Sequence, residues 1–143
     1  VAGYPEGHIE SPDIKSDIKN LKKKVDAGSD AIFTQLFFDN DKFYNYIQLL
    51  QENGIEVPVA AGIMPVRSYK QIVKMTSLAR VSIPKKLQNK IDKYKDDTKS
   101  MIEMGIDYAS EQCEELIKNK VKGLHFFTLN KSYSTAKILN NIL

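Results

Sequence analysis

The sequence predicts an α/β fold of the parallel (β/α) TIM-barrel type, present here as about half a barrel. Short apolar segments typical of buried strands alternate with segments of helical periodicity. This unit recurs four times, with extra helices before the last strand. The strand segments are almost entirely apolar, as in parallel sheets that helices cover. A complete barrel needs eight units and typically ~250 residues, whereas this chain has 143 residues. We therefore predict one α/β domain over residues 1–143.

The first two units are defined by their helix boundaries. Ser11 and the Pro-Asp pair after it predict a helix start, with a hydroxyl N-cap, proline at the first helical position and an acid in the first turn. Gly28 is expected to end that helix, and Asp39 to cap the next one. Strands are predicted at residues 1–4 and 31–38, and helices at residues 11–27 and 39–53. Because the second strand is apolar on both faces, we expect it to be covered on both sides.

The last two units contain the additional helices. Pro65 ends an apolar strand, Ser68 caps the helix after it, and Pro84 lies at the start of a further helix. Strands are predicted at residues 57–64 and 123–129, and helices at residues 68–78, 83–94, 98–119 and 132–143. The longest helix is expected to turn five residues inward: Ile102, Ile106, Ala109, Cys113 and Leu116.

Composition narrows the class of protein. With 42% hydrophobic and 27% charged residues, the chain has the composition of a soluble globular domain with a real core. The net charge of +3 comes from lysines spread over helices, which gives weak support for nucleic-acid binding and leaves small anionic ligands possible. The single cysteine excludes an internal disulfide, and no Cys/His cluster has zinc spacing, so we expect no metal site and a reducing, cytoplasmic setting.

The ends of the sequence and its apolar runs bear on targeting. No apolar run reaches the ~20 residues of a membrane span, and no charged leader precedes an apolar core at the N-terminus, so we expect no membrane association. The sequence begins at Val1, without Met and within a predicted strand. We therefore expect it to be part of a longer chain.

Polar side chains at the carboxyl ends of the strands are the candidates for function. His8, Gln35 and Asn130 lie at or just beyond those ends, where (β/α) barrels carry their active sites. A buried amide without a partner costs ~1–3 kcal/mol, so Gln35 indicates either a satisfied structural hydrogen bond or a ligand contact. His125, inside an apolar strand, is interpreted as a hydrogen-bonded core histidine, and Cys113 as inert packing.

Five ordered motifs connect the chain to a known family. They are residues 3–8 (GYPEGH), 21–28 (LKKKVDAG), 34–38 (TQLFF), 62–66 (GIMPV) and 123–130 (GLHFFTLN). Their order and spacing resemble the C-terminal half of the barrel of the methylenetetrahydrofolate reductase family, flavin enzymes of one-carbon metabolism, and the resemblance covers essentially the whole chain. It implies a barrel that binds FAD at the carboxyl ends of its strands, in agreement with the strand and helix count.

The resemblance also implies roles for individual residues. The positions that match FAD contacts of the family run from the end of the first strand through the following helix: Tyr4, His8, Ser11, Asp17, Asn20, Lys23 and Lys24. Lys19 and Lys22 of that helix are interpreted as a solvated face. Gln35 matches a glutamine that touches both folate and nicotinamide, and Gln71 and Lys131 match folate-contacting positions. Lys131 stands where many relatives have arginine, which keeps the charge and loses the bidentate fork for a carboxylate.

The implied reaction is the reduction of 5,10-methylenetetrahydrofolate to 5-methyltetrahydrofolate, with FAD as cofactor and NADH or NADPH as co-substrate. The glutamate that serves as general acid in the family belongs to the N-terminal half, so the chain alone contributes no catalytic residue and is expected to be inactive. A different interpretation rests on the half barrel itself, whose two open sheet edges and uncovered apolar face favour pairing between copies. It predicts a non-catalytic module that forms a homo-oligomer.

Overall fold

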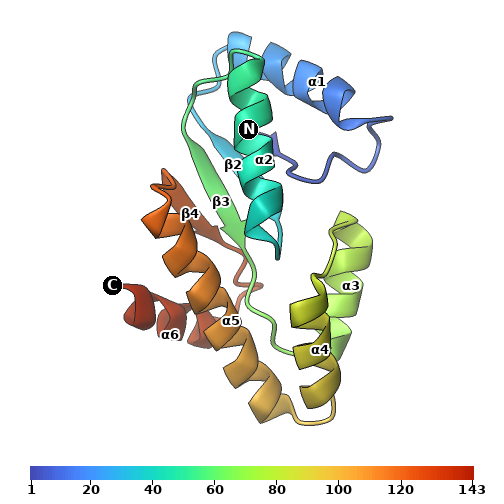
Figure 1. The fold of residues 1–143 in the computed structure, drawn as a ribbon, viewed down its shortest axis with the longest axis vertical. Coiled ribbons are helices and arrows are strands. Elements are labelled where there is room, and N and C mark those ends of the chain that lie inside the picture. Colours follow the sequence, from blue (N-terminus) through green and yellow to red (C-terminus); the bar gives the residue numbers. More distant parts are fainter.

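The computed structural model describes residues 1–143 and contains a four-stranded parallel sheet with strand order β1-β2-β3-β4. The strands are β1 (Ala2–Gly3), β2 (Ile32–Leu36), β3 (Val59–Ile63) and β4 (Gly123–Phe126). The helices are α1 (Ile14–Asp26), α2 (Asn40–Glu52), α3 (Tyr69–Ala79), α4 (Lys85–Tyr94), α5 (Thr98–Lys118) and α6 (Tyr133–Ile142). Each strand is followed by at least one helix, and three helices separate β3 from β4 (Figure 1). The predicted fold class is therefore confirmed, with the strand order of half a (β/α) barrel.

The helices cover one face of the sheet. The main core joins the outward side chains of the strands to apolar residues of α1, α2, α5 and α6, among them Ile18, Tyr46, Cys113 and Ile138. On the opposite face, Phe33 of β2 is 49% exposed. The expectation that the second strand is covered on both sides is therefore wrong for this chain, because β2 alternates between buried and accessible residues along its length.

A second core lies beyond the carboxyl ends of the strands. Leu36 and Met64, from the ends of β2 and β3, pack there with Ile72 of α3, Leu87 of α4 and Met101 of α5. This cluster attaches the two additional helices to the rest of the domain. It also explains why α3 and α4 stand apart from the sheet in Figure 1 while their inward faces are buried.

The first helix begins two residues later than predicted. Asp13, in extended conformation, is the N-cap, and its Oδ1 accepts a hydrogen bond of 2.8 Å from the Ser16 N–H. That hydrogen bond lowers the pKa of the Asp13 carboxyl. The Ser11 hydroxyl instead donates to Asp17. The prediction of Ser11 as N-cap was wrong, because a carboxylate nearer the helix accepts from the free N–H groups.

The remaining helix boundaries agree closely with prediction. Asp39 and Ser68 cap α2 and α3 as expected. The strands are shorter than predicted, since their outer residues belong to loops rather than to the ladder. In α3 Ile72 is fully buried, whereas Leu78, near the end of the helix, is 63% exposed.

No helix combines the length and the apolar character that crossing a membrane requires.

Candidate functional site

The candidate residues gather at one edge of the sheet. Tyr4 directly follows β1, and Gln35 is the penultimate residue of β2. Gln71 lies in the first turn of α3, after β3, and Lys131 in the loop after β4. Because all four strands are parallel, these positions share the carboxyl edge of the sheet, where (β/α) barrels place ligands.

The loop after β1, residues 4–13, is a tightly hydrogen-bonded segment that we call the rim loop. The Gly7 N–H donates to the Tyr4 carbonyl oxygen at 2.9 Å, and Gly7 adopts φ 87°, which favours glycine. This turn brings the Tyr4 and His8 rings together edge to face, with centroids 4.5 Å apart. The Glu10 N–H donates to Nδ1 of His8 at 3.1 Å. In the neutral imidazole the proton is then on Nε2, which makes no hydrogen bond within the chain.

Asp17 holds the rim loop against α1. Its side chain is 9% exposed, its Oδ2 accepts from the His8 N–H at 3.2 Å, and its Oδ1 accepts from the Ser11 hydroxyl at 3.3 Å. The structure therefore brings Tyr4, His8, Ser11 and Asp17 together, as predicted for a common site. It also shows that both Asp17 oxygens bind protein donors, so its direct effect is to position the loop.

The other predicted residues of α1 lie further along the helix. Asn20 and Lys24 follow Asp17 at helical spacing, and Lys23 and Lys24 occupy the last turn. Ten residues separate Ile14 from Lys24, which is about 15 Å along the helix axis. Both lysines are exposed, and neither forms a hydrogen bond with Tyr4 or His8. Ammonium groups also stabilise a helix C-terminus, so their position has a structural explanation as well as the predicted one.

Gln35 satisfies part of its hydrogen-bonding capacity within its own strand. Its Oε1 accepts from the Leu36 N–H at 2.9 Å, whereas its amide nitrogen donates to no atom of the chain. The ladder between β2 and β3 is irregular here, since the Gly62 N–H donates to the Thr34 hydroxyl at 2.9 Å and the register shifts between Phe33 and Leu36. The Gln35 side chain therefore makes a structural hydrogen bond through its oxygen, while its amide nitrogen remains available to a ligand.

Three rings on the accessible face of the sheet form a cluster that the sequence analysis did not identify. His125 packs edge to face against Phe33, with centroids 5.5 Å apart, and against Phe127 at 5.0 Å. His125 is half-buried and makes no hydrogen bond within the chain, so its interpretation as a hydrogen-bonded core histidine was wrong. The parallel register, which pairs Gly62 with His125, places it on this face. Alternation along β2 and β4 was the available signal, and such a surface suits a flat ring system.

Gln71 and Lys131 differ in their surroundings. The Gln71 Oε1 accepts from the Arg67 N–H at 2.7 Å, and its Nε2 donates to the Pro65 carbonyl oxygen at 3.3 Å. Its amide is thus turned into the loop after β3. Lys131 is exposed and follows Leu129 and Asn130, both of which have left-handed backbone conformations. Its ammonium group is free to reach an anionic ligand at the carboxyl edge.

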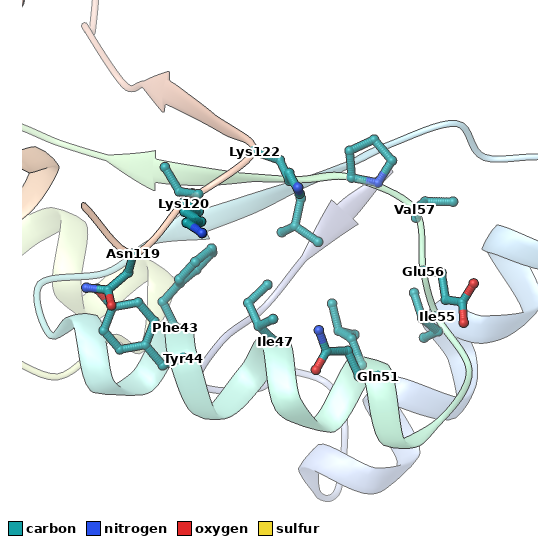
Figure 2. Close-up of a pocket in the computed structure, with 14 residues that line it drawn as sticks. Phe43, Tyr44, Ile47, Gln51, Ile55, Glu56, Val57, Asn119, Lys120 and Lys122 are labelled. Atoms are coloured by element: carbon teal, nitrogen blue, oxygen red, sulfur yellow. The ribbon is translucent and has the colours of Figure 1, made fainter. Parts of the chain in front are cut away.

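A groove lies at the opposite end of the strands. This groove of about 750 Å³ is lined by α2, by the segment before β3 and by the residues before β4. Phe43 and Ile47 project from α2 toward the strands, and Lys120 lies across from them (Figure 2). None of the predicted site residues lines it. The predicted site residues lie instead at the carboxyl edge of the sheet.

The fold and this edge define the chain as a (β/α)-barrel-type protein with aromatic and polar side chains at its carboxyl rim. Comparison with known proteins then makes the assignment specific. The family model for methylenetetrahydrofolate reductase matches residues 1–143. The chain therefore belongs to the methylenetetrahydrofolate reductase family, a family of oxidoreductases.

Individual relatives agree with this assignment. The chain is 38% identical over 151 residues to methylenetetrahydrofolate reductase (NADH) 1 of Arabidopsis thaliana, covering 99% of this chain and 26% of the relative. It is 38% identical over 144 residues to 5,10-methylenetetrahydrofolate reductase of Buchnera aphidicola subsp. Baizongia pistaciae, covering 99% of this chain and 49% of the relative. The chain thus spans about half of the bacterial relative and about a quarter of the plant one.

A solved structure shares the fold. It is an uncharacterized protein from Clostridium thermocellum, described as binding two copies of 5-methyl-5,6,7,8-tetrahydrofolic acid. The superposition has a TM-score of 0.55 at 17% sequence identity, and covers 98% of this chain and 50% of that one. The chain therefore spans half of that solved structure, a share similar to the one it covers of the bacterial relative.

Proposed function

We propose that this chain is the C-terminal half of the barrel of an FAD-dependent methylenetetrahydrofolate reductase, which reduces 5,10-methylenetetrahydrofolate to 5-methyltetrahydrofolate with NADH or NADPH. The observation that carries the proposal is the family match over the whole chain, combined with the contact between Tyr4 and His8 at the carboxyl edge. NADH appears in the name of the Arabidopsis relative, and a tetrahydrofolate in the description of the solved structure.

The residues of the rim loop and α1 have the chemistry that FAD requires. Tyr4 and His8 offer an aromatic surface with a free imidazole nitrogen, and the exposed Lys23 and Lys24 offer charge for a pyrophosphate. Asn20, exposed on the same helix, has the donor and acceptor groups that suit ribose hydroxyls. Since these residues extend from the strand end along the helix, they fit an elongated dinucleotide better than a compact ligand.

The accessible face of the sheet is the proposed place of the reacting rings. The cluster of Phe33, His125 and Phe127 lies on this face, and the free amide nitrogen of Gln35 provides a donor beside it. Gln71 and Lys131 are proposed to bind the folate, with the Lys131 ammonium attracting its carboxylates. FAD, when bound, supplies the hydride transfer from nicotinamide to the methylene carbon. The residues of this chain orient the ring systems and exclude water from the face that they cover.

A preceding half of the barrel is required by this proposal. The general acid of the family has no counterpart among the residues of this chain, and the uncovered face of the sheet needs the remaining strands to enclose a ligand. We therefore expect residues 1–143 alone to show no reductase activity.

The proposal is tested with the full-length product of the gene. We expect a yellow protein with a flavin absorption spectrum that oxidises NADH or NADPH and converts the folate substrate. A colourless and inactive full-length protein would contradict the proposal.

A matched pair of lysine variants tests the cofactor residues. Lys24→Ala is expected to weaken FAD binding roughly ten- to a hundredfold, because a charge-assisted phosphate contact is worth ~1.5–3 kcal/mol. Lys19→Ala, which removes an exposed ammonium group from the same helix, is expected to change FAD affinity less than twofold, as appropriate for a screened surface charge. The dissociation constant is measured by flavin fluorescence. Equal losses in both variants would show a general charge effect and argue against a specific phosphate contact.

A second candidate function is a self-associating half-barrel module without catalysis. It is favoured by the exposure of Phe33 and by the edge strands β1 and β4, each of which pairs on one side only. Self-association is a proposal for the isolated chain, whereas the reductase activity is a proposal for the full-length protein.

A further inference from the structure

The rim loop is attached to the domain on two sides. On one side Asp17, only a few residues away in sequence, accepts from His8 and Ser11. On the other side Glu6 reaches a segment 76 positions away: its Oε1 accepts from the Ser82 N–H at 3.0 Å, and its Oε2 accepts from the Ser82 hydroxyl at 2.7 Å. Tyr4 and His8 flank Glu6 along the chain, each two positions away from it. None of the ligand contacts proposed above involves Glu6.

A hydrogen bond from a second residue of the distant segment, Arg80, adds to this attachment. The Arg80 guanidinium Nη1 donates to the Ile9 carbonyl oxygen at 3.2 Å. Arg80 ends α3 in a left-handed conformation, with φ 50° and ψ 42°. A non-glycine residue in this region carries a conformational cost, which surrounding contacts must offset. We call the four residues Glu6, Ile9, Arg80 and Ser82 the rim clasp.

The rim clasp connects two units of the sheet that are not neighbours. The rim loop follows β1, whereas Arg80 and Ser82 belong to the turn between α3 and α4, which follows β3. The strand β2, which carries Gln35, lies between them, so the clasp joins segments that belong to strands about 10 Å apart. Figure 1 shows the turn at the end of α3 close to the loop that follows β1.

The turn is well placed to hold the loop. Val81 and Ile83, on either side of Ser82, pack against the second core, and Ile72 of α3 is fully buried in it. Gln71, the predicted folate-contacting residue, lies one position before Ile72 on the same helix. Through the clasp, the segment that carries Tyr4 and His8 is therefore fixed relative to the helix that carries Gln71.

We propose that Glu6 is a positioning residue, which through Ser82 holds the rim loop in the geometry that binds FAD and sets its position relative to the folate helix α3. This inference rests on the proposed function for the identity of the ligands. The clasp itself is a property of the chain. Glu6 contacts no proposed ligand atom and acts only through the loop.

The test uses the full-length protein with Glu6→Ala, which removes both carboxylate acceptors, and Ser82→Ala, which removes the hydroxyl donor only. The matched control is Glu10→Ala, since Glu10 is an exposed carboxylate of the same loop whose side chain makes no hydrogen bond. Arg80→Gly is the second route into the clasp, because glycine accepts the left-handed conformation while the bond to Ile9 is lost.

The first measurement is hydrogen exchange without any ligand. In Glu6→Ala we expect the amides of Gly7 and Ser11, which donate within the rim loop, to exchange roughly tenfold faster, with a smaller change in Ser82→Ala and Arg80→Gly and none in Glu10→Ala. The second is FAD affinity, expected to fall roughly tenfold in Glu6→Ala, while the urea midpoint of the FAD-free protein stays at the wild-type value.

The outcomes separate this proposal from the proposed function. Unchanged exchange of the loop amides, or unchanged FAD affinity in Glu6→Ala, overturns the positioning role. A fall in the urea midpoint that accounts for the affinity loss also overturns it, since Glu6 would then be merely structural. A wild-type protein that binds no FAD refutes the reductase proposal instead, and the exchange measurement still decides whether the clasp orders the loop.

Discussion

At the scale of single residues, burial decides the chemistry of Cys113. The side chain is fully buried on the inner face of α5, and burial raises the pKa of its thiol to about 12. A thiol that does not ionise is neither a nucleophile nor a metal ligand. The prediction from sequence that Cys113 serves packing agrees with this environment, because an inward position at helical spacing was visible in the sequence while the extent of desolvation was not.

Alkaline stability should depend on Cys113. Its pKa in the folded state, about 12, lies above its ordinary value of 9.0, so its contribution to stability is complete below pH 9 and is lost as pH rises from 9 to 12. We expect wild-type protein to lose about 1 kcal/mol more than Cys113→Ala over the first pH unit above 9. Urea unfolding at neutral and alkaline pH measures the difference. Tyr44 and Tyr108, with pKa values of about 12, are common to both proteins and cancel. Identical pH dependence in both would contradict the expectation.

Tyr46 provides a second test at this scale. Its side chain is 1% exposed, its hydroxyl faces the Tyr4 backbone without forming a well-aligned hydrogen bond, and burial raises the pKa of the phenol. Removing an unpartnered buried hydroxyl relieves its desolvation cost, so Tyr46→Phe should leave stability unchanged or raise it by up to about 1 kcal/mol.

The control is Tyr108→Phe, since the Tyr108 hydroxyl donates to the Phe38 carbonyl oxygen at 2.6 Å. Its loss should cost about 1 kcal/mol. Urea midpoints of the two variants are compared with that of the wild type. A destabilised Tyr46→Phe would mean that its hydroxyl has a partner after all.

At the scale of elements, the close approach of β2 and β3 determines the shape of the site around Gln35. A Cβ added to Gly62 would contact the Thr34 carbonyl oxygen and lie 2.8 Å from the Gln35 carbonyl oxygen. Only glycine allows the Thr34 hydroxyl to accept the Gly62 N–H in this irregular part of the ladder. The sequence shows a glycine in a strand, but not the backbone that it must accommodate.

Replacing Gly62 should therefore distort this pair of strands. Gly62→Ala is expected to destabilise the protein by about 1–3 kcal/mol, since the new methyl group meets backbone atoms that cannot move aside. Gly123→Ala is the matched control in β4, where the added Cβ would lie 3.5 Å from the Ala60 Cβ, an ordinary contact. The urea midpoints of the two variants, compared with that of the wild type, measure the loss of stability in each. Similar midpoints for the two variants would show that the strands relax around the methyl group.

Most elements could be predicted from local signals. Asp39 and Ser68 cap their helices as expected because an N-cap needs only a side-chain acceptor close to the free N–H groups. The exception is Ser11, where two acceptors lie within three residues of each other and the competition depends on backbone conformation. Ser11 then serves the rim loop through Asp17.

At the scale of the whole molecule, the main feature is that helices pack against only one face of the sheet. Helices protect one face, while Phe33 and the rings of His125 and Phe127 line the other. The edge strands β1 and β4 each offer one unpaired side. Apolar surface and open edges of this kind favour association with further strands.

The isolated chain should therefore self-associate. We expect residues 1–143 to form dimers or larger assemblies, and Phe33→Ser to raise the dissociation constant roughly tenfold or more, since burying a phenylalanine is worth ~1.5–3 kcal/mol. Leu78→Ser is the control, because Leu78 is also exposed but lies on α3, away from the sheet. Light scattering over a concentration series measures both. A monomer at every concentration would exclude this behaviour.

The sequence was sufficient to predict where the candidate site lies, but not which residues contact one another there. Tyr4, His8 and Gln35 were placed at the carboxyl edge because that edge follows from strand order and direction alone. The pairing of Glu6 with Ser82 had no local signal, since the two residues are 76 positions apart and each is an ordinary loop residue. The same holds for the contact of His125 with Phe33, which comes from another strand.

The sequence by itself determined the order of strands and helices, the helix caps at Asp39 and Ser68, and the family, because these depend on periodicity and on short motifs within one segment. Only the tertiary structure decided which face of the sheet stays open, which acceptor caps α1, and how Asp17 and Glu6 hold the loop that carries Tyr4 and His8. Those features arise where segments distant in sequence meet. At each such contact, polar groups lose their hydration and gain new hydrogen bonds, and the difference between these two free energies depends on the three-dimensional arrangement.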